Sequence, residues 1–213
     1  CCSVFRDEMP ALLPDRPEVA KLRDQTLLLS ELLTKHPDLK LPQLVRRAVV
    51  QGHCHHKAIM RFDDESKVFE RMQLGAEQLS SGCCGLAGSF GFENGKYEVS
   101  QACGERVLLP RVRDASSETL ILADGFSCRT QIEQGTERRA LHLAEVLELA
   151  LQHGPAGPGP GVRPEQGFVD ERTRALERTR RKAALVCSAI ALGLLAGAGC
   201  WLKARRPSRW VGA

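Results

Sequence analysis

Four cysteines, in three short segments that each contain glycine, carry the residue type best suited to binding a soft metal. Cys54 lies in Gln-Gly-His-Cys-His-His, Cys83 and Cys84 lie in Ser-Gly-Cys-Cys-Gly, and Cys128 lies in Asp-Gly-Phe-Ser-Cys-Arg. Thiolates are the preferred protein ligands of iron–sulfur clusters and are common ligands of zinc. The neighbouring glycines allow tight turns and a close approach of the backbone. We therefore predict these four cysteines as ligands of an iron–sulfur cluster, with zinc as the alternative.

Other uses of cysteine stay open at this point. Disulfides form in oxidising compartments, and an inert buried cysteine packs as a small apolar residue, which is what we expect of Cys103 in the middle of a helix. The candidate accessory ligands are Cys1, Cys2, His55 and His56. A histidine beside a metal site more often holds the ligands through hydrogen bonds than binds the metal itself.

The sequence contains no complete catalytic motif. The glycine-rich run 85–91 matches neither GxGxxG nor GxxxxGK[ST], so it does not predict a nucleotide site. There is also no HExxH pattern and no CxxCxxCxxxCP run of the ferredoxin type. We therefore assign no catalytic residue.

The elements that must position the cysteines alternate between strand and helix. Residues 43–52, 75–80 and Thr119–Ala123 read as strands, and 17–35, 64–73, 96–113 and 138–152 read as helices. This alternation predicts an α/β fold with a parallel sheet and flanking helices. Each cysteine segment follows one predicted strand, and the carboxyl ends of parallel strands meet at one edge. The thiols should therefore meet there.

The C-terminal third differs from the rest in composition. Residues 154–213 hold 11 of the 30 Lys and Arg but only 4 of the 26 Asp and Glu, so the remainder is slightly acidic and carries no basic stripe for nucleic acid. The uncharged run 183–202 is long enough for a transmembrane helix. We expect a cysteine-rich domain over 1–153, followed by a Pro/Gly linker over 154–169 and a basic juxtamembrane segment over 170–182. A single-pass anchor over 183–202 in the lipid bilayer and a basic tail over 203–213 would complete the chain. The cysteine-rich body should lie in the cytoplasm.

The order of the cysteine motifs matches a known arrangement. HCHH, SGCCG, GSFGFE, GERVLLP, ADGFSC and RALHLAEVL follow one another within residues 1–150. In this the chain resembles the C-terminal cysteine-rich (CCG) domain of iron–sulfur oxidoreductases, above all the FAD-linked oxidases of the D-2-hydroxyglutarate/D-lactate dehydrogenase type. It is also similar to the iron–sulfur subunits of anaerobic glycerol-3-phosphate dehydrogenase and glycolate oxidase, and to the heterodisulfide reductase component that is designated B.

The resemblance implies electron transfer through an iron–sulfur centre of a flavin-linked 2-hydroxy acid dehydrogenase. In the pattern C…CCG…CxxC of that family, Cys54, Cys83, Cys84 and Cys128 match, whereas Gln131 stands where the last cysteine is expected. FAD would reside on an upstream domain or a partner flavoprotein, and the electrons would leave toward a quinone or another acceptor.

Two other functions stay open on the sequence. One is a non-catalytic, zinc- or thiol-stabilised module that tethers a partner to the membrane. The other is a truncated fragment without activity of its own, which is in line with a chain that begins at Cys1 rather than at a methionine.

Overall fold

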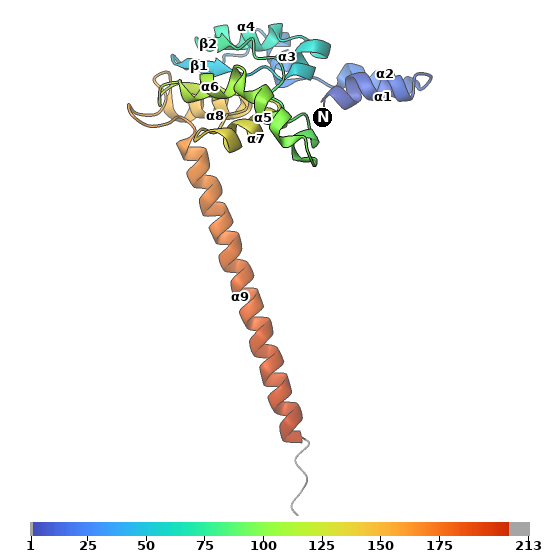
Figure 1. Ribbon diagram of the computed structural model, residues 1–213, viewed down its shortest axis with the longest axis vertical. Coiled ribbons are helices and arrows are strands. Elements are labelled where there is room, and N and C mark those ends of the chain that lie inside the picture. Colours follow the sequence, from blue (N-terminus) through green and yellow to red (C-terminus); the bar gives the residue numbers. More distant parts are fainter. Residues whose placement is uncertain (1, 205–213) are drawn as a thin grey trace, which may run out of the picture. The chain divides into compact units, whose positions relative to one another are not determined.

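The computed structural model describes residues 2–204, and side chains for residues 2–185 of these. The chain divides into two compact units, Cys1–Gln166 and Gly167–Ala213. The first unit is an α/β structure that contains all four predicted cysteine ligands (Figure 1). The second unit consists, in its described part, of the helix α9 (Gln166–Ala204).

The sheet of the first unit has three parallel strands in the order β2-β1-β3. They are β1 (Arg47–Val50), β2 (Gly75–Gln78) and β3 (Leu120–Leu122), and Ala48 of β1 pairs with both Ala76 and Leu120. β3 is buried along its whole length, as its continuous apolar run predicts, whereas β2 is exposed at the edge. The prediction of an α/β fold with a parallel sheet is confirmed.

Helices and short helical turns surround this sheet. In chain order they are η1 (Val4–Glu8), α1 (Met9–Leu12), α2 (Pro17–Gln25), α3 (Leu29–Lys35), η2 (His56–Met60), α4 (Asp63–Arg71), η3 (Phe90–Phe92), α5 (Tyr97–Glu105), α6 (Leu108–Arg113), α7 (Phe126–Gly135) and α8 (Leu143–His153). α3 contacts α4 and α8, and α6 contacts α5 and α7. Figure 1 shows α3 and α4 on one side of β1 and β2, and α5, α6 and α7 on the other.

Two helices that the sequence predicts as continuous are each divided in two. Over 17–35, α2 ends at Gln25 and α3 begins at Leu29, because the Glu31 carboxylate accepts a hydrogen bond from the Leu28 N–H at 2.8 Å and so caps a new helix. Over 96–113, α5 ends at Glu105 and α6 begins at Leu108. Pro110 has no N–H to continue the helical hydrogen bonds, and its ring disfavours a continuous helix there.

The predicted helix over 138–152 begins five residues late because its first residues extend the sheet. Leu141 donates its N–H to the Ile121 carbonyl at 2.8 Å and accepts from the Ala123 N–H at 3.0 Å. The helix α8 then starts at Leu143, capped by the His142 ring nitrogen and the Glu145 carboxylate. A fourth stretch of extended chain therefore lies beside β3.

The hydrophobic core lies between the sheet and the helices α6 and α7. Val49 and Ile121 from the sheet pack with Leu109, Val112 and Ile132, all of them buried. Apolar burial of this kind stabilises a fold by about 25 cal/mol per Å². The core also includes two of the predicted ligands, Cys84 and Cys128, so the packing that holds the strands also fixes these two cysteines.

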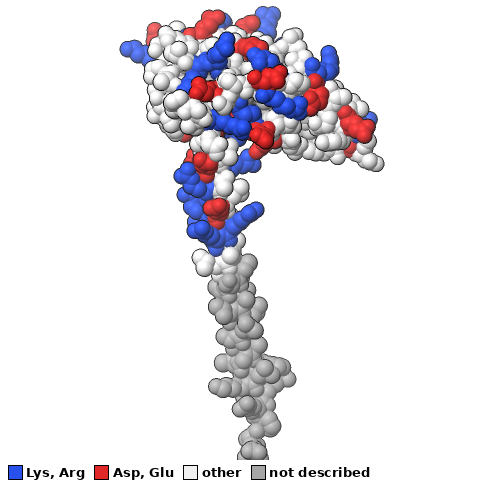
Figure 2. Space-filling model, turned by 60° about the vertical axis from the view of Figure 1, so that its left-hand side comes forward, with Lys and Arg blue, Asp and Glu red and all other residues white. Residues whose placement is uncertain are grey.

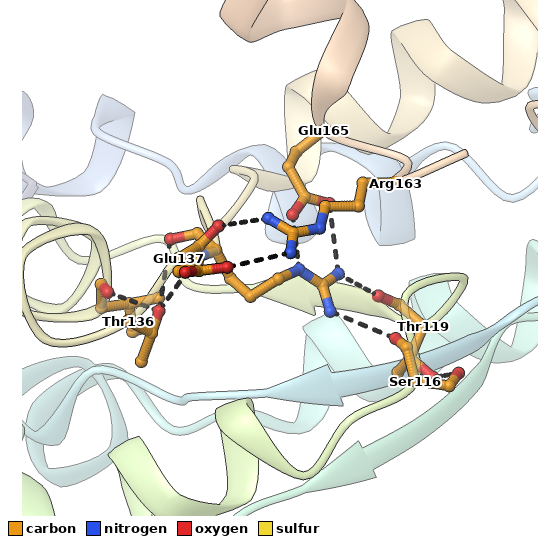
Figure 3. A network of polar contacts seen from close by, with 8 residues as sticks. Ser116, Thr119, Thr136, Glu137, Arg163 and Glu165 are labelled. Atoms are coloured by element: carbon orange, nitrogen blue, oxygen red, sulfur yellow. Dashed lines mark hydrogen bonds and ion pairs between the residues drawn. The ribbon is translucent and has the colours of Figure 1, made fainter. Parts of the chain in front are cut away.

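A buried ion pair holds the end of the first unit against this core (Figure 3). The Arg138 guanidinium lies 2.5 Å from the Glu165 carboxylate and also donates to the carbonyls of Ser116 and Thr119. The preceding Pro/Gly segment is held as well, since the Val45 N–H donates to the Pro155 carbonyl at 2.8 Å. The chain from 154 to 166 is thus attached to the α/β unit at several points.

We expect Arg138→Leu to lower the free energy of unfolding by about 3–5 kcal/mol, because it leaves the buried Glu165 carboxylate without its cation. The exposed pair Arg163–Glu137 provides the control, and Arg163→Leu should cost under about 1 kcal/mol. Denaturant unfolding measures both. The double variant Arg138→Leu/Glu165→Leu should regain most of the loss, and equal costs for the two single variants would contradict the assignment.

The prediction of a transmembrane helix over 183–202 is wrong. Within the part of the chain that the structure describes, no helix is both long enough and apolar enough to cross a membrane. The helix that contains this run begins at Gln166, and its described side chains include the exposed cations of Arg174, Arg178 and Arg181. Figure 2 shows basic side chains along the described part of this helix. The single-pass anchor and the membrane location derived from it are corrected accordingly. The side chains of 186–202, nearly all of the expected tail over 203–213, and Cys1 lie outside the described residues.

Candidate functional site

The four cysteines follow the carboxyl ends of the three strands. Cys54 follows β1, Cys83 and Cys84 follow β2, and Cys128 lies in the first turn of α7 after β3. Because the strands are parallel, these segments all leave the sheet at the same edge. Cys84 and Cys128 are buried, and Cys54 and Cys83 are half-buried.

Cys84 and Cys128 interact directly through their thiols. A hydrogen bond from the Cys128 thiol, supported by the N–H groups of Leu86 and Ala87, lowers the pKa of Cys84 to about 6 although burial opposes this. The same contact, together with burial, raises the pKa of Cys128 far above its ordinary value. The contact therefore favours the thiolate form of Cys84 over that of Cys128, and a thiolate is the form that binds soft metals.

Cys54 and Cys83 complete the cluster of sulfur atoms. Burial raises the pKa of Cys83, the Gly85 N–H opposes this with a hydrogen bond at 3.4 Å, and the charges of Cys54 and Cys84 raise it further. Cys54 and Cys83 also raise the pKa of Cys128. The thiols of Cys54 and Cys84 are thus close enough to Cys83 and Cys128 to raise the pKa values of these two thiols.

The loop that carries Cys83 and Cys84 is held by the backbone of Gly85. This residue has φ +98°, and a Cβ added to it would lie 2.1 Å from the Ser100 carbonyl oxygen in α5. A residue with a side chain therefore does not fit between the loop and the helix. The close approach fixes the position of the cysteine pair relative to α5.

The donor set fits a soft metal in its chemistry. Four thiols, one of them with a lowered pKa, are the ligands that iron–sulfur clusters and zinc use. As they stand, no group of three or more His, Cys, Asp or Glu side chains among the described residues has the geometry of a metal site. The role of the four cysteines as metal ligands therefore stays a prediction.

Three candidate accessory ligands lie among the described residues, namely His55, His56 and Cys2. Each of them contacts a group other than the four thiols. The His55 ring lies 3.8 Å from the Asp7 carboxylate, and the buried His56 ring lies 3.3 Å from Glu65. The Cys2 thiol donates to the Leu27 carbonyl at 3.6 Å. Their role as accessory ligands stays a prediction.

Gln131 and Cys103 lie beside the Cys83–Gly85 loop. Gln131 is 1 % exposed and donates to the Ser100 carbonyl at 3.3 Å. Cys103 is half-buried, with its β carbon near Gly85. The buried Gln131 side chain thus packs next to the loop that carries Cys83 and Cys84.

Sequence analysis missed a buried polar group near the cysteine segments. Ser30, His56 and Glu65 are buried together, and burial raises the pKa of Glu65 to about 7 and lowers the pKa of His56. The sequence does contain a signal for Glu65. It occupies the apolar stripe of α4, one turn before the buried Val68 and Phe69.

Comparison with known proteins identifies relatives of two kinds. Over 157 residues the chain is 32% identical to the component of anaerobic glycerol-3-phosphate dehydrogenase that is designated C in Escherichia coli K12, a match that covers 71% of this chain and 38% of that protein. Over 100 residues it is 32% identical to D-2-hydroxyglutarate dehydrogenase of Pseudomonas putida KT2440, which covers 46% of this chain and 10% of that protein. D-2-hydroxyglutarate dehydrogenase of Pantoea ananatis matches over 83 residues at the same identity. No known family profile and no solved structure matches the chain.

The fold and the cysteine segments define an α/β domain with a thiol cluster at the carboxyl edge of a parallel sheet. The relatives place it more closely: the chain is a partial homologue of this glycerol-3-phosphate dehydrogenase component and of D-2-hydroxyglutarate dehydrogenase, consistent with a C-terminal CCG domain of FAD-linked oxidases. The resemblance drawn from the sequence is confirmed. The chain spans about two fifths of the length of the glycerol-3-phosphate dehydrogenase components that it matches.

Proposed function

We propose that this chain is an electron-transfer domain of a flavin-linked dehydrogenase that acts on a 2-hydroxy acid, with an iron–sulfur cluster held by Cys54, Cys83, Cys84 and Cys128. Its relatives are named as dehydrogenases or as components of dehydrogenases, which supports a role associated with an oxidoreductase. The observation that carries the proposal is the placement of four cysteines after the ends of three parallel strands, where Cys54 and Cys84 lie close enough to Cys83 and Cys128 to raise their pKa values. Packing alone does not require four cysteines at one edge.

The residues of this chain have three tasks in that role. The thiols hold the cluster, which when bound accepts and donates single electrons. Burial of Cys84 and Cys128 in the hydrophobic core keeps water away from that side of the site. The N–H groups of Leu86 and Ala87 hydrogen-bond to the Cys84 sulfur, and hydrogen bonds to ligand sulfurs tune the reduction potential of a cluster.

The electron donor in this proposal is a flavoprotein, either another domain or a separate polypeptide, because FAD-linked oxidases supply electrons from a reduced flavin. The lipid bilayer and the quinone expected from the sequence are not part of the proposal, since neither the described helices nor the relatives support them.

The test is the metal content of the full chain, purified without oxygen. We expect iron and acid-labile sulfide in similar amounts, with broad absorption in the visible range that reduction by dithionite bleaches. Zinc alone would indicate the non-catalytic, zinc-stabilised module and would overturn the proposal, because zinc has no redox chemistry. A chain without metal, with free thiols or disulfides, would overturn it as well.

A further inference from the structure

Gln51 is a buried polar side chain directly after β1, where the preceding residues are apolar. Ala48, Val49 and Val50 of the strand are at most 2 % exposed, and Gln51 is 1 % exposed. A buried amide costs free energy unless its nitrogen and its oxygen both find hydrogen-bond partners, whereas an aliphatic side chain would fill the same space without this requirement. The partners of the Gln51 amide therefore indicate why a glutamine stands at this position.

Both polar atoms of the Gln51 side chain bind the segment that leads to Cys83. Oε1 accepts a hydrogen bond from the hydroxyl of the buried Ser81, and Nε2 donates to the Gly82 carbonyl at 3.3 Å. The last backbone hydrogen bond that the structure describes between this segment and β1 lies earlier, from the Leu79 N–H to a β1 carbonyl at 2.9 Å. The Gln51 side chain therefore continues the attachment of the segment to β1 up to the residue before Cys83.

The hydrogen bond to Gly82 acts on the peptide unit that contains the Cys83 nitrogen. A peptide unit is planar, so a donor that holds the Gly82 carbonyl also fixes the direction in which the chain enters Cys83. Gly82 itself has φ +68°, a left-handed conformation that turns the chain directly before the cysteine. Gln51 therefore holds the turn from which the Cys83 side chain extends.

Gln51 is also linked to the two other segments that carry cysteines. It lies three residues before Cys54, and its N–H donates at 2.8 Å to the Leu122 carbonyl of β3, the strand that leads to Cys128. Burial raises the pKa of Cys83, and the charge of the Cys54 thiol and a hydrogen bond with that thiol raise it further, so these two thiols lie side by side. Gln51 thus connects the two segments whose thiols are neighbours.

We propose that Gln51 is a positioning residue for the thiol cluster and that its amide holds the Cys54 and Cys83 sulfur atoms beside each other before a metal binds. Gln51 acts through these two cysteines and does not bind the metal itself. This role rests on the proposed function, in which the cysteines are metal ligands. Ligands that are held in place beforehand lose less conformational entropy when the metal binds, so residues that orient them contribute to the affinity of the site.

The variant Gln51→Leu tests this role, because leucine has a similar size and forms neither hydrogen bond. Co²⁺ serves as the probe, since its complexes with thiolates absorb strongly in the near ultraviolet. In a titration of the full chain without oxygen, we expect Gln51→Leu to bind Co²⁺ about 10- to 100-fold more weakly than the unaltered chain. Arg71→Leu is the matched control. Arg71 also joins two segments, by donating to the Leu33 carbonyl at 2.6 Å, but neither segment carries a predicted ligand, so its loss should leave the affinity for Co²⁺ unchanged.

The double variant Gln51→Leu/Ser81→Ala separates positioning from stability. Gln51→Leu leaves the buried Ser81 hydroxyl without its acceptor, which costs stability, and Ser81→Ala removes that hydroxyl. The double variant should therefore regain part of the free energy of unfolding in denaturant, while its affinity for Co²⁺ stays low. If the affinity recovers together with the stability, or if Gln51→Leu binds Co²⁺ as tightly as the unaltered chain, the proposal is wrong.

Cross-linking of the metal-free chain measures the spacing of the two thiols directly. Dibromobimane becomes fluorescent when two neighbouring thiols displace its two bromides, and mass spectrometry should locate the link between Cys54 and Cys83. We expect the yield to fall in Gln51→Leu but not in Arg71→Leu, and equal yields in all three chains would overturn the proposal. If the unaltered chain does not bind Co²⁺, the proposed metal site fails, and the cross-link then decides on the positioning role alone. Should Gln51→Leu not fold, Ser81→Ala, which removes one of the two hydrogen bonds, takes its place in both measurements.

Discussion

Replacing Cys84 with serine is expected to lower the iron content per molecule of protein at least tenfold. Cys84 is the thiol of the cluster whose pKa is lowered, which favours the thiolate that a soft metal binds. A serine hydroxyl is a hard donor and stays protonated at neutral pH, so it cannot replace the thiolate on a soft metal. Iron and sulfide analysis after anaerobic purification measures the loss.

Cys103→Ser is the matched control for this variant. Cys103 lies on α5 with its β carbon near Gly85. The thiols that shift the pKa values of Cys83, Cys84 and Cys128 belong to the four cysteines of the cluster. We expect the iron content of Cys103→Ser to differ from that of the unaltered chain by no more than about a third. Thermal unfolding of both variants separates loss of a ligand from loss of the fold. An equal loss of iron would show that Cys103 is a ligand and not a packing residue.

The sheet could be predicted from the sequence because its strands carry strong local signals. Thr119–Ala123 is a continuous apolar run, and a buried parallel strand of three residues lies within it. The helix divisions escaped the analysis of apolar spacing, because that spacing does not register a capping residue or a proline. One example is Glu31, which caps α3 and also pairs with Arg6 at 2.5 Å. The late start of α8 follows from Leu141, which pairs with β3 across twenty residues of chain.

The candidate site was likewise predictable only where it follows from the topology of the sheet. The meeting of the cysteine segments follows from topology alone, since parallel strands end at one edge. The group formed by Ser30, His56 and Glu65 depends on the packing of α3 against α4, which hydropathy patterns do not specify. The membrane helix expected over 183–202 is not supported, because no helix of the described residues is long and apolar enough to cross a membrane.

The second large effect is expected for Gly85→Ala, which should lower the free energy of unfolding by about 4 kcal/mol or more. Two costs add in this variant. An alanine at φ +98° is strained, and its Cβ would lie 2.1 Å from the Ser100 carbonyl oxygen. That oxygen belongs to the backbone of α5, so it cannot move without shifting the helix. Denaturant unfolding followed by circular dichroism measures the loss.

Gly88→Ala separates the two costs, because it lies in the same loop with φ +70° and has nothing within 4 Å of the added Cβ. This variant should cost only about 1 kcal/mol, the strain of a positive φ alone. The difference between the two variants then measures the contact of the loop with α5. If both variants cost the same, the loop can move away from α5. The cysteine pair would then be positioned by the metal it binds and not by the packing of Gly85.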